Sequence, residues 1–155
     1  MRIVLVAPQI PQNTGSIGRL CAGHNIPLHL VEPLGFELSD KYLKRAGLDY
    51  WPHIELQVHP DLSDVLDIFP NANKWFLSAR ATQSFWDVTY EQGDVLIFGC
   101  EASGLPDDVK AKAGDRLIGI PHNHNIRSLN LAQAASVVTY EALRQIHSNR
   151  LLIGD

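Results

Sequence analysis

The chain has 155 residues, of which 45% are hydrophobic and 19% charged, and its formal net charge is −4. This length and composition predict one globular domain over residues 1–155 with its own buried core, and they exclude disordered, fibrous and disulfide-scaffold proteins. The cysteines Cys21 and Cys100 lie far apart, and no apolar run approaches the ~20 residues of a membrane-spanning helix. We therefore expect a cytoplasmic protein without a membrane anchor, in which any nucleic acid binds to a local basic patch.

Apolar runs and segments of helical period alternate along the chain. The apolar runs predict strands at 2–7, 28–31, 54–58, 74–79, 94–99 and 117–120. The segments of helical period predict helices at 14–24, 39–46, 61–69 and 129–147, with a short helix after Pro106. This alternation predicts an α/β domain with a mainly parallel sheet flanked by helices. Ligands bind at the carboxyl ends of such strands, so the loops after Ala7, Ala79, Gly99 and Ile120 are the candidate site loops.

The first candidate segment is the stretch 13–19, NTGSIGR. Glycine and hydroxyl residues at a helix start let an anion approach free N–H groups, and Arg19 allows a bidentate phosphate contact. A simpler interpretation is that Asn13 or Thr14 caps the helix and Arg19 is a solvated surface residue. A nicotinamide dinucleotide site that uses Glu32 is disfavoured, because the glycines read GxxG instead of GxGxxG.

The second candidate segment is the stretch 96–106, LIFGCEASGLP. Its single carboxylate, Glu101, follows an expected strand, which is a common place for a site residue. Cys100 also allows a thiol-hydrolase interpretation with His122 or His124 as the base. Nothing in the sequence brings those side chains together, and a small buried cysteine is the more frequent outcome.

The third candidate segment spans residues 120–145, where an expected strand ends at Ile120 and a long helix follows a polar loop. Asn130 to Gln133 is similar to a capping box, so Asn130 is expected to cap that helix. His122 and His124 alternate as in some metal sites, but no third and fourth ligand follow at typical spacings. We expect no metal.

Together, these three segments resemble the SPOUT superfamily of S-adenosylmethionine-dependent RNA methyltransferases. The resemblance is strongest to the small members that methylate the 2′-hydroxyl of cytidine or uridine at tRNA position 34, the wobble nucleotide. It includes IPQNTG and RLCA around the first segment, FGCEASGLP in the second, RSLNLAQAASVVTYEALRQ in the third, and the run DKYLKRAGLDY at 40–50. It implies an α/β fold with a C-terminal deep trefoil knot, S-adenosylmethionine as cofactor, a tRNA acceptor and a homodimer that builds each site from both subunits.

The resemblance also implies roles for particular residues. The positions expected to contact the cofactor are Ser78, Gly99, Ile120 and Ser128. The positions expected to be catalytic are Arg19, Glu101, Asn130 and Tyr140. From the positions of its basic residues, the sequence itself indicates that RNA binds to Arg19, Lys41, Lys44, Arg45 and Arg127. The cluster of Lys41, Lys44 and Arg45 also fits a solvated helix face. The second segment departs from the family, because Cys100 replaces a proline and Ala102-Ser103 replace a hydroxyl and a basic residue.

A guanidinium stays protonated, with a reference pKa of about 12.5 or above, so Arg19 is a poor general base. We hypothesise instead that Arg19 clamps a phosphate and the reacting oxygen, and that Glu101 orders it. Two alternatives stay open: 2′-O-methylation at another tRNA or rRNA site, and a non-catalytic nucleotide-binding or RNA-binding module with the same fold.

Overall fold

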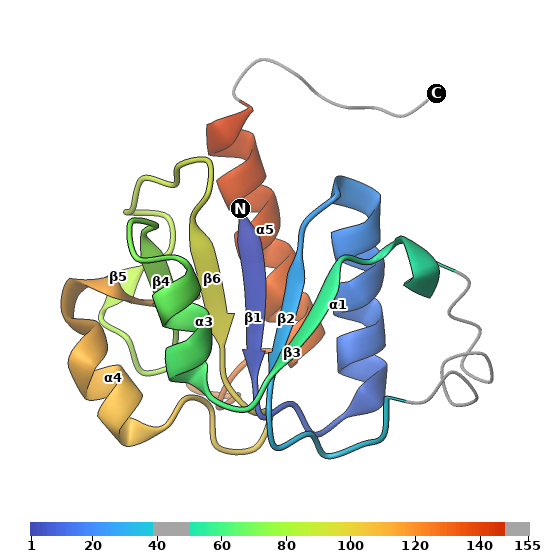
Figure 1. Ribbon diagram of the computed structural model, residues 1–155. Helices are drawn as coiled ribbons and strands as arrows, with labels where there is room; N and C mark the ends of the chain where they lie inside the picture. Colours follow the sequence, from blue (N-terminus) through green and yellow to red (C-terminus); the bar gives the residue numbers. More distant parts are fainter. Residues whose placement is uncertain (39–49, 148–155) are drawn as a thin grey trace.

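The computed structural model describes residues 1–38 and 50–147 and contains a seven-stranded sheet, with strand order β3-β2-β1-β6-β4-β7-β5 (Figure 1). Every neighbouring pair of strands is parallel. The strands are β1 (Arg2–Val6), β2 (Leu28–Val31), β3 (Leu56–His59), β4 (Lys74–Leu77), β5 (Gln83–Ser84), β6 (Val95–Phe98) and β7 (Leu117–Gly119). The helices are α1 (Pro11–His24), α3 (Leu62–Ile68), α4 (Asp107–Ala113) and α5 (Leu131–Ile146), with 3-10 helices at Trp51–His53 and Gly114–Arg116.

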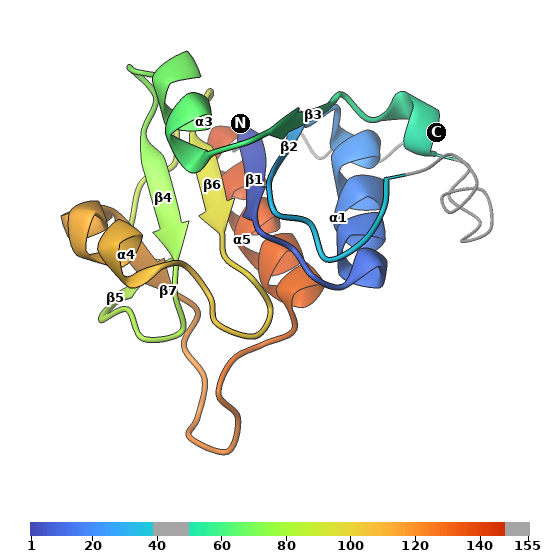
Figure 2. The same cartoon turned by 60° about the horizontal axis from the view of Figure 1, so that its bottom comes forward.

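Helices cover both faces of the sheet, which explains why the central strands are continuous apolar runs. Figures 1 and 2 show α1 and α5 on one face of the sheet and α3 and α4 on the other. Side chains alternate along β1, so Ile3 and Leu5 pack in the core on the side of α1 and α5, while Val4 and Val6 pack in the core on the side of α3 and α4. α1 and α5 also pack against each other. The expected parallel α/β sheet flanked by helices is confirmed, and the knot stays a prediction.

The start of α1 differs from the expectation. α1 begins at Pro11 and not at residue 14, its N-cap is Ile10 without a side-chain cap, and Asn13 and Thr14 are buried inside the helix. The interpretation of Asn13 or Thr14 as a cap is therefore wrong. Pro11 fits the first helical turn because proline has no N–H to leave unpaired there.

Other expectations differ in smaller ways. The strand expected at 54–58 is β3, Leu56–His59, preceded by the 3-10 helix Trp51–His53, and the two-residue strand β5 was not expected. The helix expected at 39–46 lies outside the described residues. No helix in the described parts of the chain is long and apolar enough to cross a membrane.

Candidate functional site

A cavity of about 540 Å³ lies at the carboxyl edge of the sheet, within the range of about 300–1,000 Å³ typical of small-molecule sites. Its walls come from the start of α1 and from the segments that follow β4, β6 and β7. Figure 2 shows the loops after β1, β4, β6 and β7 at one edge of the sheet. The expected convergence of these loops is confirmed.

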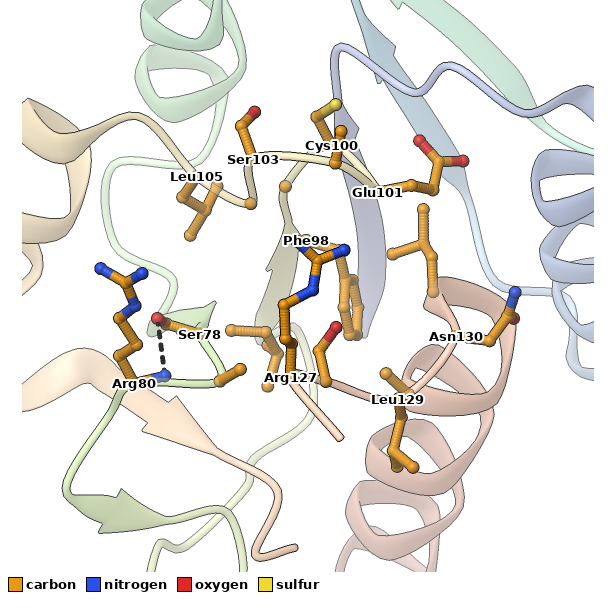
Figure 3. A pocket seen from close by; sticks show the side chains of 18 of the residues that line it. Ser78, Arg80, Phe98, Cys100, Glu101, Ser103, Leu105, Arg127, Leu129 and Asn130 are labelled. Atoms are coloured by element: carbon orange, nitrogen blue, oxygen red, sulfur yellow. Dashed lines mark hydrogen bonds between the residues drawn. The ribbon is translucent and has the colours of Figure 1, made fainter. Parts of the chain in front are cut away.

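The floor and walls of the cavity combine apolar side chains with hydroxyls (Figure 3). Leu77, Phe98 and Ile120 supply apolar surface from three neighbouring strand ends. Ser78, Gly99, Ile120 and Ser128, the positions expected to contact the cofactor, all line this cavity. The structure therefore brings these positions together, while their contact with a cofactor stays a prediction.

Gly99 is required by the turn that forms one wall. A Cβ at Gly99 would lie 2.1 Å from the backbone of both Gly104 and Leu105. The chain folds back there through hydrogen bonds from the Cys100 amide to the Gly104 carbonyl (3.2 Å) and from the Gly104 amide to the Cys100 carbonyl (2.8 Å). Gly104 has φ +71°, which favours glycine. The second segment is therefore shaped by its glycines.

The glycines of the first segment lie within α1 and away from the cavity. Gly15 and Gly18 are buried inside α1, and neither lines the cavity. The Tyr50 hydroxyl donates to the Gly15 carbonyl at 2.8 Å, and a Cβ at Gly18 would lie 2.7 Å from the side chain of Ile54. The absence of a side chain at Gly18 therefore admits Trp51 and Ile54 to the surface of α1, and neither Gly15 nor Gly18 faces the cavity of its own chain.

A chain of three polar side chains connects the cavity walls. Asn130 Nδ2 donates to Asn13 Oδ1 at 2.9 Å, and Asn13 Nδ2 donates to Glu101 Oε1 at 3.0 Å. Asn130 Oδ1 also accepts hydrogen bonds from the amides of Ala132 and Gln133, so the expected capping of α5 is confirmed. This network fixes the starts of α1 and α5 relative to the loop after β6.

Glu101 caps the start of α1 from a distant part of the sequence. Its carboxylate accepts the backbone N–H groups of Gln9 (2.8 Å) and Ile10 (3.1 Å). Burial alone would raise the pKa of Glu101, but hydrogen bonds from Asn13 and from those amides hold that pKa below its usual value. Glu101 therefore stays ionised at neutral pH, and its oxygens are already engaged.

Arg19 and Tyr140 lie outside the cavity of their own chain. The Arg19 guanidinium is exposed and lies over the Tyr50 ring, 4.9 Å from its centroid. Tyr140 is 57% exposed on α5, and its hydroxyl lies 3.1 Å from Nε2 of His24. The hypothesis that Glu101 orders Arg19 is wrong within this chain, because the Glu101 oxygens bind the start of α1.

Cys100 lines the cavity and is half-buried, so the expectation of a fully buried cysteine is wrong. His122 also lines it, but its Nδ1 and Nε2 lie 2.8 and 3.3 Å from the carbonyl oxygens of Ile120 and Arg127. The histidine is thus held by its own loop and not against the thiol. Among residues 1–38 and 50–147, no group of three or more metal-ligating side chains is present.

The expected RNA-binding residues are only partly visible. Lys41, Lys44 and Arg45 lie outside the described residues, whereas Arg127 is exposed and lines the cavity. Arg80, which sequence reasoning missed, also lines it. The signal that could have identified Arg80 is a basic residue in the loop after an expected parallel strand.

Known proteins are similar to this chain over most of its length. Residues 1–140 match the model of the SpoU rRNA Methylase family. The chain is 44% identical over 145 residues to the tRNA (cytidine(34)-2'-O)-methyltransferase of Saccharophagus degradans, covering 93% of this chain and 94% of that protein. The protein of the same name from Methylovorus glucosotrophus is 42% identical over 144 residues, covering 92% and 94%.

A solved structure from work on the 2-OH methylation of C/U34 on tRNA is also similar. It has a TM-score of 0.88 and 45% sequence identity, and the alignment covers 96% of this chain and 97% of that one. The chain belongs to the SpoU methylase family.

Proposed function

We propose that the protein transfers a methyl group from S-adenosylmethionine to the ribose 2′-hydroxyl of cytidine or uridine at position 34 of tRNA. Its membership of the SpoU methylase family and the names of its full-length relatives support the reaction and the acceptor. The observation that carries the proposal is the convergence of Ser78, Gly99, Ile120 and Ser128 on one cavity.

The chemistry of the cavity fits this cofactor. Leu77, Phe98 and Ile120 offer apolar surface to an adenine ring, and the hydroxyls of Ser78 and Ser128 offer polar partners for a nucleoside. When bound among Leu77, Phe98 and Ile120, S-adenosylmethionine would supply the electrophilic methyl group, carried on a sulfonium, for the ribose 2′-oxygen. The protein's main task is alignment, which can contribute about 7–11 kcal/mol toward the barrier.

Arg19 would act on the acceptor from the second subunit of a homodimer. This inference rests on the position of Arg19, outside the cavity of its own chain, on α1. α5, which packs against α1, exposes Val137 (42%) and Tyr140 (57%), and apolar surface of this kind favours association. A guanidinium suits a clamp on a phosphate and the reacting oxygen, and its positive field favours loss of the hydroxyl proton.

Basic residues would hold the acceptor tRNA. Lys41, Lys44, Arg45 and Arg127 would contact phosphates of the anticodon loop. Because the chain has a net charge of −4, we expect the RNA to bind through few phosphates, with an affinity that still falls steeply as the salt concentration rises. We expect the protein in the cytoplasm, with the tRNA pool.

Incubation with isotope-labelled S-adenosylmethionine and bulk tRNA, followed by nuclease digestion and nucleoside mass spectrometry, tests the proposal. We expect label in 2′-O-methylcytidine or a 2′-O-methyluridine derivative from position 34, with Arg19→Lys as the low-activity control. Label at another tRNA position or in rRNA would contradict the acceptor. Tight binding of S-adenosylhomocysteine without any transfer would favour the non-catalytic module.

A further inference from the structure

Two arginines at the cavity differ from the other cations of the described chain in the contacts that their side chains make. Among residues 1–38 and 50–147, only the guanidinium groups of Arg80 and Arg127 have no ion pair, hydrogen bond or aromatic ring contact. The other cations lie over rings (Arg2, Arg19 and Arg116), bind carbonyl oxygens (Lys74) or form ion pairs (Lys110, Lys112 and Arg144).

Both arginines are exposed and line the same cavity, although they come from different loops. Arg80 follows β4, where its backbone N–H is held by the Ser78 hydroxyl at 3.2 Å, and Arg127 lies in the loop between β7 and α5. Figure 3 shows Arg127 in the middle of the cavity, with its guanidinium beside Phe98, and Arg80 at the edge of the cavity beyond Ser78. The backbone of each loop is thus placed while the charged end is left for another partner.

The acidic groups in the cavity wall do not neutralise this pair. Asp107 forms an ion pair with Lys110 at 2.6 Å. Lys110, and to a smaller extent the charge of Arg80, lower the pKa of Asp107. Glu101 accepts its hydrogen bonds from Asn13 and from the start of α1. The cavity lining therefore holds two guanidinium groups that form no ion pair within the described part of the chain, against one ionised carboxylate, Glu101, that also forms none.

We propose that Arg80 and Arg127 form a phosphate clamp at the mouth of the cavity, which holds the RNA backbone on either side of the reacting ribose. The inference rests on the proposed function and extends it, because it adds Arg80 to the RNA-binding residues and gives the two loops a joint role. Arginine suits this task, since its planar fork binds phosphate oxygens bidentately. An RNA phosphate is favoured over the cofactor carboxylate because both arginines, although they line the cavity, are exposed residues that a large ligand can reach from outside.

The test uses Arg80→Gln, Arg127→Gln and the double variant in the full chain, with Arg116→Gln as the control. Arg116 is an exposed arginine that lies over the Trp75 ring and does not line the cavity. Arg116→Gln therefore makes the same change in the net charge of the protein and leaves the cavity lining unchanged. Thermal unfolding checks that each variant folds. Calorimetry measures S-adenosylhomocysteine affinity, and fluorescence anisotropy measures tRNA affinity in its presence at several salt concentrations.

Each single variant should bind tRNA about tenfold more weakly, and the slope of log affinity against log salt should fall by about one. S-adenosylhomocysteine affinity should stay within twofold, and Arg116→Gln should match the wild type. Weaker S-adenosylhomocysteine binding with unchanged tRNA binding would overturn the clamp and assign the arginines to the cofactor carboxylate. Unchanged binding of both would also overturn it.

These outcomes are separable from failure of the proposed function. If the wild type methylates position 34 and the variants keep full tRNA affinity, only the clamp is wrong. If the variants lose tRNA affinity as expected but the wild type transfers no methyl group to position 34, the clamp stands and the proposed acceptor site is wrong.

Discussion

Arg19 is held by an aromatic ring and not by a carboxylate. Its guanidinium lies 4.9 Å from the centroid of the Tyr50 ring, and the Tyr50 hydroxyl is fixed by the Gly15 carbonyl at 2.8 Å. A cation over a ring keeps its outward N–H groups available, because the ring face takes the place of a hydrogen-bonding partner. The contact therefore orients Arg19 without occupying the donors that a phosphate clamp requires.

Arg19→Lys should lower the rate of methyl transfer to tRNA by about ten- to a hundredfold, because lysine keeps the charge but lacks the bidentate fork. S-adenosylhomocysteine affinity should not change. Steady-state kinetics and calorimetry measure the two quantities, and Arg116→Lys, which alters an arginine over the Trp75 ring away from the cavity, is the matched control. Near-normal turnover of Arg19→Lys would remove Arg19 from the active site.

At the scale of elements, the start of α1 shows what sequence reasoning misses. The resemblance brought Asn13, Glu101 and Asn130 together as motif positions, but only the cap on α5 follows from local sequence. Ile10, the N-cap residue of α1, makes no side-chain capping hydrogen bond. Glu101, which lies 91 residues from Ile10 along the chain, accepts the Ile10 N–H instead. A helix start that depends on a distant residue leaves no signal in the local sequence. The sequence therefore predicted that α1 begins at residue 14, whereas it begins at Pro11.

Glu101→Gln tests this distant cap. The glutamine amide presents an N–H₂ group where the carboxylate accepts the N–H groups of Gln9 and Ile10, so the free energy of unfolding should fall by about 1–3 kcal/mol. Urea denaturation measures it against Glu91→Gln, which makes the same change at an exposed glutamate and should stay within about 0.5 kcal/mol of the wild type. Equal stability of the two variants would refute the capping role of Glu101.

At the scale of the whole molecule, the apolar runs predicted the class of sheet but not its strand order. β4 and β7 lie side by side although 39 residues separate Leu77 from Leu117, and β5 pairs with β7 at the sheet edge. Periodicity reports the environment of each strand and not its neighbour, so these pairings could not be predicted. β5 is only the dipeptide Gln83–Ser84, which is too short and too polar to give a strand signal.

The same sheet contains a buried histidine pair that should limit stability in acid. His29 Nδ1 lies 2.9 Å from His59 Nε2, and burial, followed by the charges of His59 and Arg2, lowers the pKa of His29 to about 4. Because the unfolded chain binds a proton at this residue near pH 6.5 and the folded chain does not, stability is full above pH 6.5 and falls as the pH drops toward 4.

We expect a loss of roughly 1–3 kcal/mol in the free energy of unfolding from His29 over this pH range. Urea denaturation at a series of pH values measures it. His29→Leu should have a shallower dependence on pH between 6.5 and 4, whatever its stability at neutral pH. Identical slopes for the wild type and the variant would show that another group controls the acid response.

The proposed function depends on the identity of the cavity at the ends of β4, β6 and β7. A crystal structure of the protein with S-adenosylhomocysteine tests it most directly. We predict one nucleoside per chain in this cavity, in contact with Ser78, Gly99, Ile120 and Ser128. Density for the nucleoside at any other place on the molecule would contradict the account.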